Sequence, residues 1–237
     1  MNRRTLVAGL AALTLSLAGC SSSVSGVAEP AASADGTGGA GQSTTTERIS
    51  ASLDSMLLTP TDFPTPYQAI VLAPQAVAQA AADLGGIPAG AKVDPAGCKP
   101  PTQDYGPDST AMIVGTDNDK RATVTVELTR VDRPLATRTA EIGQCLEVAT
   151  TKDGATAHVT TKILPGPPIN ADDTMAMRQT VTSGEAGATV KQSMLTLVGQ
   201  VADVRISATY MSFGDGKPDS ATLDQVFTEA VQRVHAA

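Results

Sequence analysis

Three consecutive stretches in the C-terminal part of the chain restrict its fold more than any other feature. In residues 174–183, 188–198 and 202–212, apolar side chains recur at every second position. This alternation is typical of β-strands that bury one face. Turn-forming residues separate the stretches, as in residues 183–187 and around Gly199. The three stretches therefore predict an antiparallel meander.

Burial predicts the register of this meander, because a slip of one residue would exchange the two faces of a strand. We expect one face to gather nearly all the large apolar residues: Met175, Met177, Val181, Val190, Met194, Val198, Ala202, Val204, Ile206, Ala208 and Tyr210. The opposite face is expected to be solvated and carries Arg178, Lys191, Ser193, Asp203, Arg205 and Ser207. This register requires connections that are longer than two residues.

Further strands and helices are predicted on both sides of the meander along the chain. Residues 111–115 and 122–131 read as a hairpin, a later strand carries Val159 and Ile163, and residues 87–107 read as a Pro/Gly-rich loop. Helical spacing of apolar residues occurs in 47–58, 74–84, 134–150 and the residues that follow the capping Asp219. The pattern predicts an α+β fold, an antiparallel sheet with helices packed mainly on one face.

The first twenty residues have the features of an export signal. Arg3 and Arg4 precede an uncharged apolar run, residues 6–17, which is too short to span a bilayer. The tetrapeptide Leu17-Ala18-Gly19-Cys20 resembles the lipobox of bacterial lipoproteins, in which the cysteine receives a diacylglyceryl group and becomes the first residue after cleavage. The resemblance implies a signal peptide over residues 1–19 and a lipid on Cys20 that holds the mature chain on the extracytoplasmic face of the cell membrane.

Two alternatives stay open for this segment. An ordinary cleaved signal would place Cys20 at the boundary without a lipid. The pair Arg3-Arg4 also leaves both the general secretory route and the twin-arginine route open.

The remaining chain divides into a stalk and one domain. Residues 20–46 begin with the cysteine of the lipobox and continue as a Ser/Gly/Ala/Thr-rich tract without hydrophobic periodicity, which predicts a flexible stalk. Residues 47–237 contain no internal repeat and no second linker, and their number suits a single domain.

Charge and aromatic content argue against nucleic acid as a partner. The net charge of the full chain is −7, and loss of Arg3 and Arg4 with the signal leaves 15 basic and 24 acidic residues, a net charge of −9. An acidic surface repels the phosphate backbone and anionic lipid headgroups. The chain has no Trp, three Phe and three Tyr, so base-stacking side chains are scarce.

The cysteines suggest one disulfide. If lipid takes Cys20, Cys98 and Cys145 remain as an even pair in an oxidising exported environment. We predict a disulfide between them. Two separate buried thiols are the alternative.

The residues that could carry catalysis or bind a metal are few and scattered. The two histidines, His158 and His235, have no ligand cluster near them in the sequence, so we expect no metal site and no cofactor. The sequence contains no nucleophile elbow and no phosphate-binding loop. The adjacent carboxylates Asp172 and Asp173 stand before a strand, where turn residues are common. We therefore expect a protein that is not an enzyme.

Two apolar features could mark a binding surface. Leu195 and Leu197 fall on the strand face that is otherwise polar, where an exposed patch would suit a ligand or a partner protein. A helix that covers this face would explain them equally well. Met175, Met177 and Met194 could line an adaptable groove, although their spacing also suits core packing.

The lipobox, the Ser/Gly-rich stalk, the entry sequence Leu57-Leu58-Thr59-Pro60-Thr61-Asp62-Phe63, the lone cysteine pair and the meander together resemble an actinobacterial, mycobacterial type of lipoprotein. The domain from Ile49 is more distantly similar to the extracellular sensor domains of mycobacterial receptor kinases. That resemblance implies helices against an antiparallel sheet and a cleft for an unidentified ligand. Sensor domains of this kind have two disulfides, whereas this chain can form one.

These observations lead to two expectations of function. The first is a membrane-anchored, non-catalytic binding or sensing domain in the cell envelope, with a small molecule, a lipid or an envelope protein as its partner. The second is a structural or scaffolding envelope protein that binds a partner protein.

Overall fold

The computed structural model describes residues 47–184, 189–214 and 216–237. These residues belong to one compact unit, Thr44–Ala237. The predicted signal peptide, Cys20 and the predicted stalk lie outside the described residues. In the part of the chain that is described, no helix is both long and apolar enough to cross a membrane.

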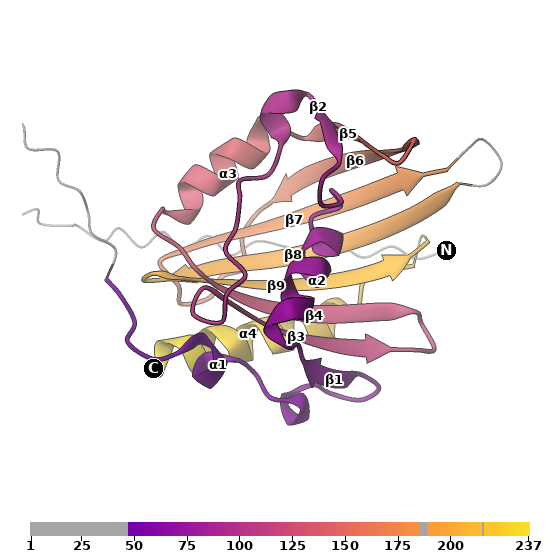
Figure 1. Ribbon diagram of the computed structural model, residues 1–237. Coiled ribbons are helices and arrows are strands. Elements are labelled where there is room, and N and C mark those ends of the chain that lie inside the picture. Colours follow the sequence, from indigo (N-terminus) through magenta and orange to yellow (C-terminus); the bar gives the residue numbers. More distant parts are fainter. Residues whose placement is uncertain (1–46, 185–188, 215) are drawn as a thin grey trace, which may run out of the picture. The chain divides into compact units, whose positions relative to one another are not determined.

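An open, fully antiparallel sheet forms the framework of the domain (Figure 1). In the described residues it has nine strands in the order β1-β3-β4-β9-β8-β7-β6-β5-β2. The strands are β1 (Gln68–Val71), β2 (Lys92–Asp94), β3 (Thr110–Asp117), β4 (Ala122–Arg130), β5 (Glu147–Lys152), β6 (Ala155–Leu164), β7 (Asp173–Ser183), β8 (Val190–Val201) and β9 (Val204–Phe213). The predicted meander is present as β7, β8 and β9, next to one another in the sheet.

The predicted register is right between β7 and β8 and wrong between β8 and β9. Met175 pairs with Val198, as expected for a shared face. Leu197, however, pairs with Ala208, so Leu197 shares a face with the apolar residues of β9, and Val198 lies opposite Ser207. The slip follows from the turn, which is a two-residue connection of Ala202 and Asp203, with φ of 49° at Ala202, instead of a longer turn around Gly199.

Gly199 lies inside β8, where it gives α4 (Ser220–His235) room to approach the sheet. A Cβ atom at Gly199 would stand 3.2 Å from Phe227 Cζ and 3.6 Å from Val231 Cγ2. Asp219 caps α4 as predicted, because its carboxylate accepts a hydrogen bond from the backbone N–H of Thr222. The predicted apolar stripe is buried against the sheet and consists of Leu223, Val226, Phe227, Ala230, Val231 and Val234. Full burial of one such large side chain contributes about 1.5–3 kcal/mol.

Consecutive residues of β8 pack against different helices. Leu197 belongs to the core cluster that contains α4. Val198 instead shares a cluster with Met175 and with Leu135 of α3 (Leu135–Gly143). Since successive strand residues point to opposite faces, these two clusters lie on opposite faces of β8. Figure 1 shows α2 (Pro74–Leu84) in front of the sheet and α4 behind it. The fold is thus mixed α/β around an antiparallel sheet, and the expectation that the helices pack mainly on one face stays a prediction.

The other predicted helices match the structure to different degrees. The predicted bounds of α2 are those observed, and Gly86 follows its end with a φ of 66°. The first helix is only α1 (Leu53–Met56), capped by Ser52. The third ends at Gly143, and residues 147–150 of the predicted helix belong to strand β5. The short helices η1 (Pro60–Asp62) and η2 (Ala96–Cys98) and the edge strands β1 and β2 are not expected from the sequence.

Candidate functional site

A polar cleft lies at the end of β4, between β9, α3 and the loop that follows η2. Residues 101–104, Ser109, residues 129–134, Arg138 and Arg205 line it. Its volume is about 220 Å³. Segments that are far apart in the sequence therefore meet around one small space.

The disulfide between Cys98 and Cys145 connects two of these segments. Cys98 ends η2 just before the cleft-lining loop, and Cys145 stands two residues after the end of α3. Their Cα atoms are 5.5 Å apart. Both cysteines pack against a small cluster of buried valines, which includes Val148 and Val159. The structure thus contains the predicted disulfide, and this bond ties one wall of the cleft to the helix that forms another.

Gln103 connects the loop to the sheet beneath it. Its Nε2 donates to Glu127 Oε1 on β4 at 2.8 Å and to Thr110 Oγ1 at 3.3 Å. Burial raises the pKa of the Glu127 carboxyl, and it outweighs the hydrogen bonds from Gln103 and Thr129 and the charge of Arg205, which all act in the opposite direction. Beneath the cleft there is therefore a carboxyl group whose ionised form is poorly solvated.

Besides Arg130, three arginines from different segments line the cleft. Arg133 follows β4, Arg138 belongs to α3, and Arg205 belongs to β9. Glu141 of α3 bridges the first two, because its Oε1 accepts from Arg133 Nη1 at 2.8 Å and its Oε2 accepts from Arg138 Nη1 at 3.5 Å. Arg205 Nη2 donates to the backbone oxygen of Arg133 and to Gln200 Oε1, both at 3.3 Å.

Arg205 has a buried donor that is not satisfied. Its Nε has no hydrogen-bond partner among the described residues. Burial lowers the pKa of Arg205, and the positive charges of Arg138 and Arg133 lower it further. Glu141 and Glu127 raise this pKa, but each has a smaller effect than either arginine. A bound hydrogen-bond acceptor would satisfy this donor, and an acceptor with a negative charge would also offset part of the repulsion between the arginines.

The other charged residues of the cleft have partners or are exposed. Arg130 is paired with Asp203, whose two carboxylate oxygens each lie 2.9 Å from Arg130 Nη1. Asp104 accepts hydrogen bonds from the backbone of Gly106 and from Ser109 Oγ, and these bonds lower the pKa of Asp104. Asp132 is exposed.

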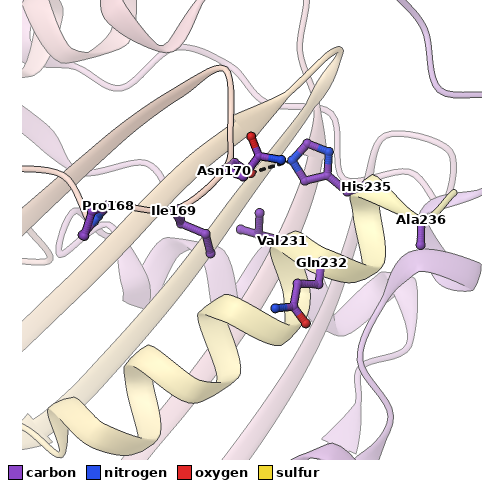
Figure 2. A pocket seen from close by; sticks show the side chains of 7 residues that line it. All are labelled: Pro168, Ile169, Asn170, Val231, Gln232, His235 and Ala236. Atoms are coloured by element: carbon purple, nitrogen blue, oxygen red, sulfur yellow. Dashed lines mark hydrogen bonds between the residues drawn. The ribbon is translucent and has the colours of Figure 1, made fainter.

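A second, shallower depression lies beside the C-terminal end of α4 (Figure 2). It lies between residues 168–170 and the last two turns of the helix. Figure 2 shows Ile169 and Val231 between the two segments and a hydrogen bond that joins the ring of His235 to the backbone oxygen of Asn170. The Gln232 amide points away from His235 in this view. The depression lacks the convergent charged groups of the first cleft, so the first cleft is the stronger candidate.

The structure does not place Leu195 and Leu197 on an open surface. Leu197 is 7% exposed and belongs to the main core, and Leu195 is partly buried against the same cluster. Of the two interpretations of these residues, the covering helix is the one that the packing matches. The three methionines are core residues as well, since Met175 and Met194 are buried and Met177 packs beside Met175.

The residues considered for metal binding and catalysis are dispersed. His158 is exposed on β6, and His235 lies at the end of α4. Asp172 accepts a hydrogen bond from the backbone of Ala202, and Asp173 accepts one from the backbone of Thr174. Within the described residues, no group of three or more His, Cys, Asp or Glu side chains could hold a metal ion.

Sequence reasoning did not find the arginine-lined cleft. Arg205 was expected on a solvated face together with Asp203, which is in fact buried. Arg138 fell in residues 134–150, which were expected to be one continuous helix, and Arg133 stands just before them. The convergence of these arginines with Arg205 depends on the β8–β9 register, which the sequence pattern misjudged.

Comparison with known proteins gives only distant likenesses. No family model matches the chain, and no curated protein matches its sequence. The chain is similar to the X-ray structure of an uncharacterized protein from Mycobacterium smegmatis, an Rv0999 ortholog, with 14% identity, coverage of 73% of this chain and 92% of that one, and a TM-score of 0.44. It is also similar to the extracellular domain of PknH from Mycobacterium tuberculosis, with 11% identity, coverage of 54% and 64%, and a TM-score of 0.37. Both similar structures come from mycobacteria, and neither likeness is strong enough to carry an argument about the site.

Proposed function

We propose that the chain is a membrane-anchored lipoprotein whose domain binds or senses a small molecule in the cell envelope without converting it. The observation that carries this proposal is the cleft at the end of β4, where Gln103, Arg138 and Arg205 meet from three separate segments. Binding sites are concave and present a few convergent polar groups, and this cleft has both properties.

The polar groups of the cleft suit recognition better than catalysis. Guanidinium groups stay protonated at neutral pH, so Arg133, Arg138 and Arg205 cannot act as general bases. Asp104 already accepts two hydrogen bonds within its own loop. The amide of Gln103 can donate and accept hydrogen bonds but does not titrate. These groups can orient a ligand by hydrogen bonds and charge.

The membrane anchor in this proposal is supported by sequence. Leu17-Ala18-Gly19-Cys20 supports a lipid on Cys20, and a flexible stalk over residues 20–46 would reach about 30 Å from the membrane surface. This reach would allow the domain to meet a solute of the envelope or a component of the membrane.

The alternative is a scaffolding protein that binds a partner protein, and one feature favours it. Strand β1 stands at an edge of the sheet. Its residues Ile70 and Val71 are 62% and 51% exposed. An exposed edge strand can pair with a strand of another protein.

Native mass spectrometry of the full chain, purified in detergent from a mycobacterial host, tests the first proposal. Thr102 is exposed and lines the cleft, so Thr102→Trp fills the cleft without a change of charge. Thr156→Trp makes the same replacement at an exposed position of β6, outside the cleft lining. We expect a molecule of defined mass on the unchanged chain and on Thr156→Trp, and its loss from Thr102→Trp.

Two results would contradict the proposal. A molecule that remains on Thr102→Trp at the same occupancy would show that the cleft is not the binding site. An unchanged chain that carries no molecule, but co-purifies with a protein that Ile70→Asp releases, would support the scaffold.

A further inference from the structure

The arginines of the cleft specify the chemistry of its ligand more narrowly than the cleft as a whole. The inference that follows rests on the proposed function, because it concerns the occupant of the same site. Arg205 provides its starting point. A buried guanidinium N–H without a partner costs free energy that an acceptor on a ligand would recover.

Glu141 shows that two of these arginines can hold a carboxylate. Its two oxygens accept from Arg133 and Arg138 separately, at 2.8 Å and 3.5 Å. Arginine is well suited to oxyanions because its planar donors match the oxygens of carboxylate and phosphate groups. One internal carboxylate thus serves two guanidinium groups, and the third, Arg205, is not bonded to it in the described contacts.

The acidic residues nearby do not neutralise the positive charge of these arginines. Asp104 is bonded within its loop, and Asp132 is exposed. Arg138 and Arg133 each lower the pKa of Arg205 more than Glu141 or Glu127 raises it. A ligand with a negative group would therefore gain from charge as well as from hydrogen bonds.

We propose that the cleft binds the oxyanion group, phosphate or carboxylate, of a small ligand, with Arg205, Arg133 and Arg138 as its donors. A volume of about 220 Å³ has room for one such group and a small remainder. The oxyanion could belong to a soluble metabolite or to a lipid headgroup, since the chemistry recognised is the same.

Isothermal titration of the full chain in detergent with inorganic phosphate and with citrate tests this proposal. We expect at least one of them to bind, and Arg205→Gln to weaken that binding roughly tenfold or more, as is typical for loss of a charged hydrogen bond. Arg138→Gln should weaken it as well, and this residue is partly exposed, so the second variant remains informative if the first folds poorly. Arg178→Gln is the matched control, because Arg178 is exposed on β7 and outside the cleft lining.

A second variant should act in the opposite direction. Glu141→Gln removes the internal carboxylate that Arg133 and Arg138 share. Both guanidinium groups then become available to the ligand. We expect the affinity for the same anion to rise several-fold. An unchanged or weaker affinity in this variant would contradict the assigned donors.

Vesicle sedimentation distinguishes the two sources of the oxyanion. A Cys20→Ser chain without residues 1–19 lacks both the predicted lipid site and the apolar run of the predicted signal, so any membrane binding comes from the domain. Sedimentation with phosphatidylglycerol vesicles but not phosphatidylcholine vesicles, lost in Arg205→Gln, would assign a lipid headgroup. Binding of phosphate or citrate without sedimentation would assign a soluble ligand.

The inference and the proposed function can fail separately. If phosphate, citrate and anionic vesicles all fail to bind, and Arg205→Gln keeps the co-purified molecule that Thr102→Trp loses, the cleft binds a ligand of another class. That outcome overturns the oxyanion assignment and leaves the binding function standing. Retention of the molecule by Thr102→Trp overturns both.

Discussion

Single charged residues join segments that are distant in the sequence. Asp203, at the turn between β8 and β9, accepts hydrogen bonds from Arg130 of β4 and from the backbone of Ile49. Arg130 also donates to the backbone oxygen of Ala51, so the pair attaches the segment before α1 to the sheet. Loss of either partner would leave a buried charge without its counter-charge, which lowers the free energy of unfolding by roughly 3–5 kcal/mol. Because Asp203 neutralises Arg130, Arg130 does not add to the positive charge that a ligand in the cleft would meet.

Glu127 gives a pH-dependent prediction at the residue scale. Burial raises the pKa of the Glu127 carboxyl above the ordinary value of 4.5. The folded state therefore holds this proton more tightly than the unfolded state, and stability falls as the pH rises through the interval between the two pKa values. The Glu127→Gln variant avoids that loss of stability, and the amide oxygen of the new side chain can still accept the hydrogen bond from Gln103. We expect the free energy of unfolding to rise by about 1 kcal/mol at pH 7 and to change little near pH 4.

Urea denaturation of the variant and of the unchanged chain at the two pH values measures this difference. Glu147→Gln is the control, since Glu147 is exposed on β5. A Glu127→Gln chain that is less stable at pH 7, or that gains equally at both pH values, would argue against a poorly solvated carboxylate at this position.

At the scale of elements, the sequence predicts the long periodic segments well and the short ones poorly. The bounds of α2 and the capped start of α4 follow from Pro74, Gly86 and Asp219, which are strong local signals. Strand β1 has four residues and β2 has three, too few for a periodic signal. The segment after Gly143 carries apolar residues at helical spacing, yet it pairs with β6 as strand β5. Tertiary pairing overrides local periodicity there.

The connections between elements explain why the cleft was not predicted. The turn at Asp153-Gly154 has two consecutive positive φ angles, as Asp-Gly turns favour, so the turn itself has a clear signal in the sequence. The turn at Ala202-Asp203 has no such signature, because Ala rarely adopts a positive φ. One misplaced turn exchanges the faces of β9, and this exchange moved Arg205 from the cleft to an expected solvated surface.

The disulfide carries a prediction for the elements that it joins. Cys98 and Cys145 are separated by 47 positions in the sequence. In the chain-entropy model, closing a loop of this length contributes up to about 4 kcal/mol. We expect the double variant Cys98→Ser, Cys145→Ser to lose up to that amount in urea denaturation. It should also bind the anion more weakly, because the 101–109 wall of the cleft is no longer tied to α3.

Reduction of the unchanged chain is the control for this prediction. Dithiothreitol should reproduce both effects in the unchanged chain and have no effect on the double variant. Alkylation of both cysteines in the unreduced chain would show that the bond is absent in solution.

At the scale of the whole molecule, charge is distributed in a way that fits a local anion site. The full chain has a net charge of −7, so its surface as a whole repels anions. Besides Arg130, which is paired with Asp203, three arginines nevertheless line one small cleft. A site of this kind would select a small ligand by local donors and would not attract extended polyanions such as nucleic acid.

Two surfaces compete as the functional one, and they lie on different strands. The cleft is built on β4 and β9 with α3, whereas the exposed apolar residues Ile70 and Val71 lie on the edge strand β1. A ligand in the cleft and a partner strand at the edge would slow amide exchange in different segments, because each would protect the backbone that it covers.

Hydrogen–deuterium exchange of the full chain, with its co-purified molecule retained or removed by dialysis, therefore tests the central claim most directly. The account predicts slower exchange in residues 101–109 and 131–138 when the molecule is bound, with no change in Gln68–Val71. Protection confined to Gln68–Val71, with residues 101–109 and 131–138 unchanged, would contradict it and favour the scaffold.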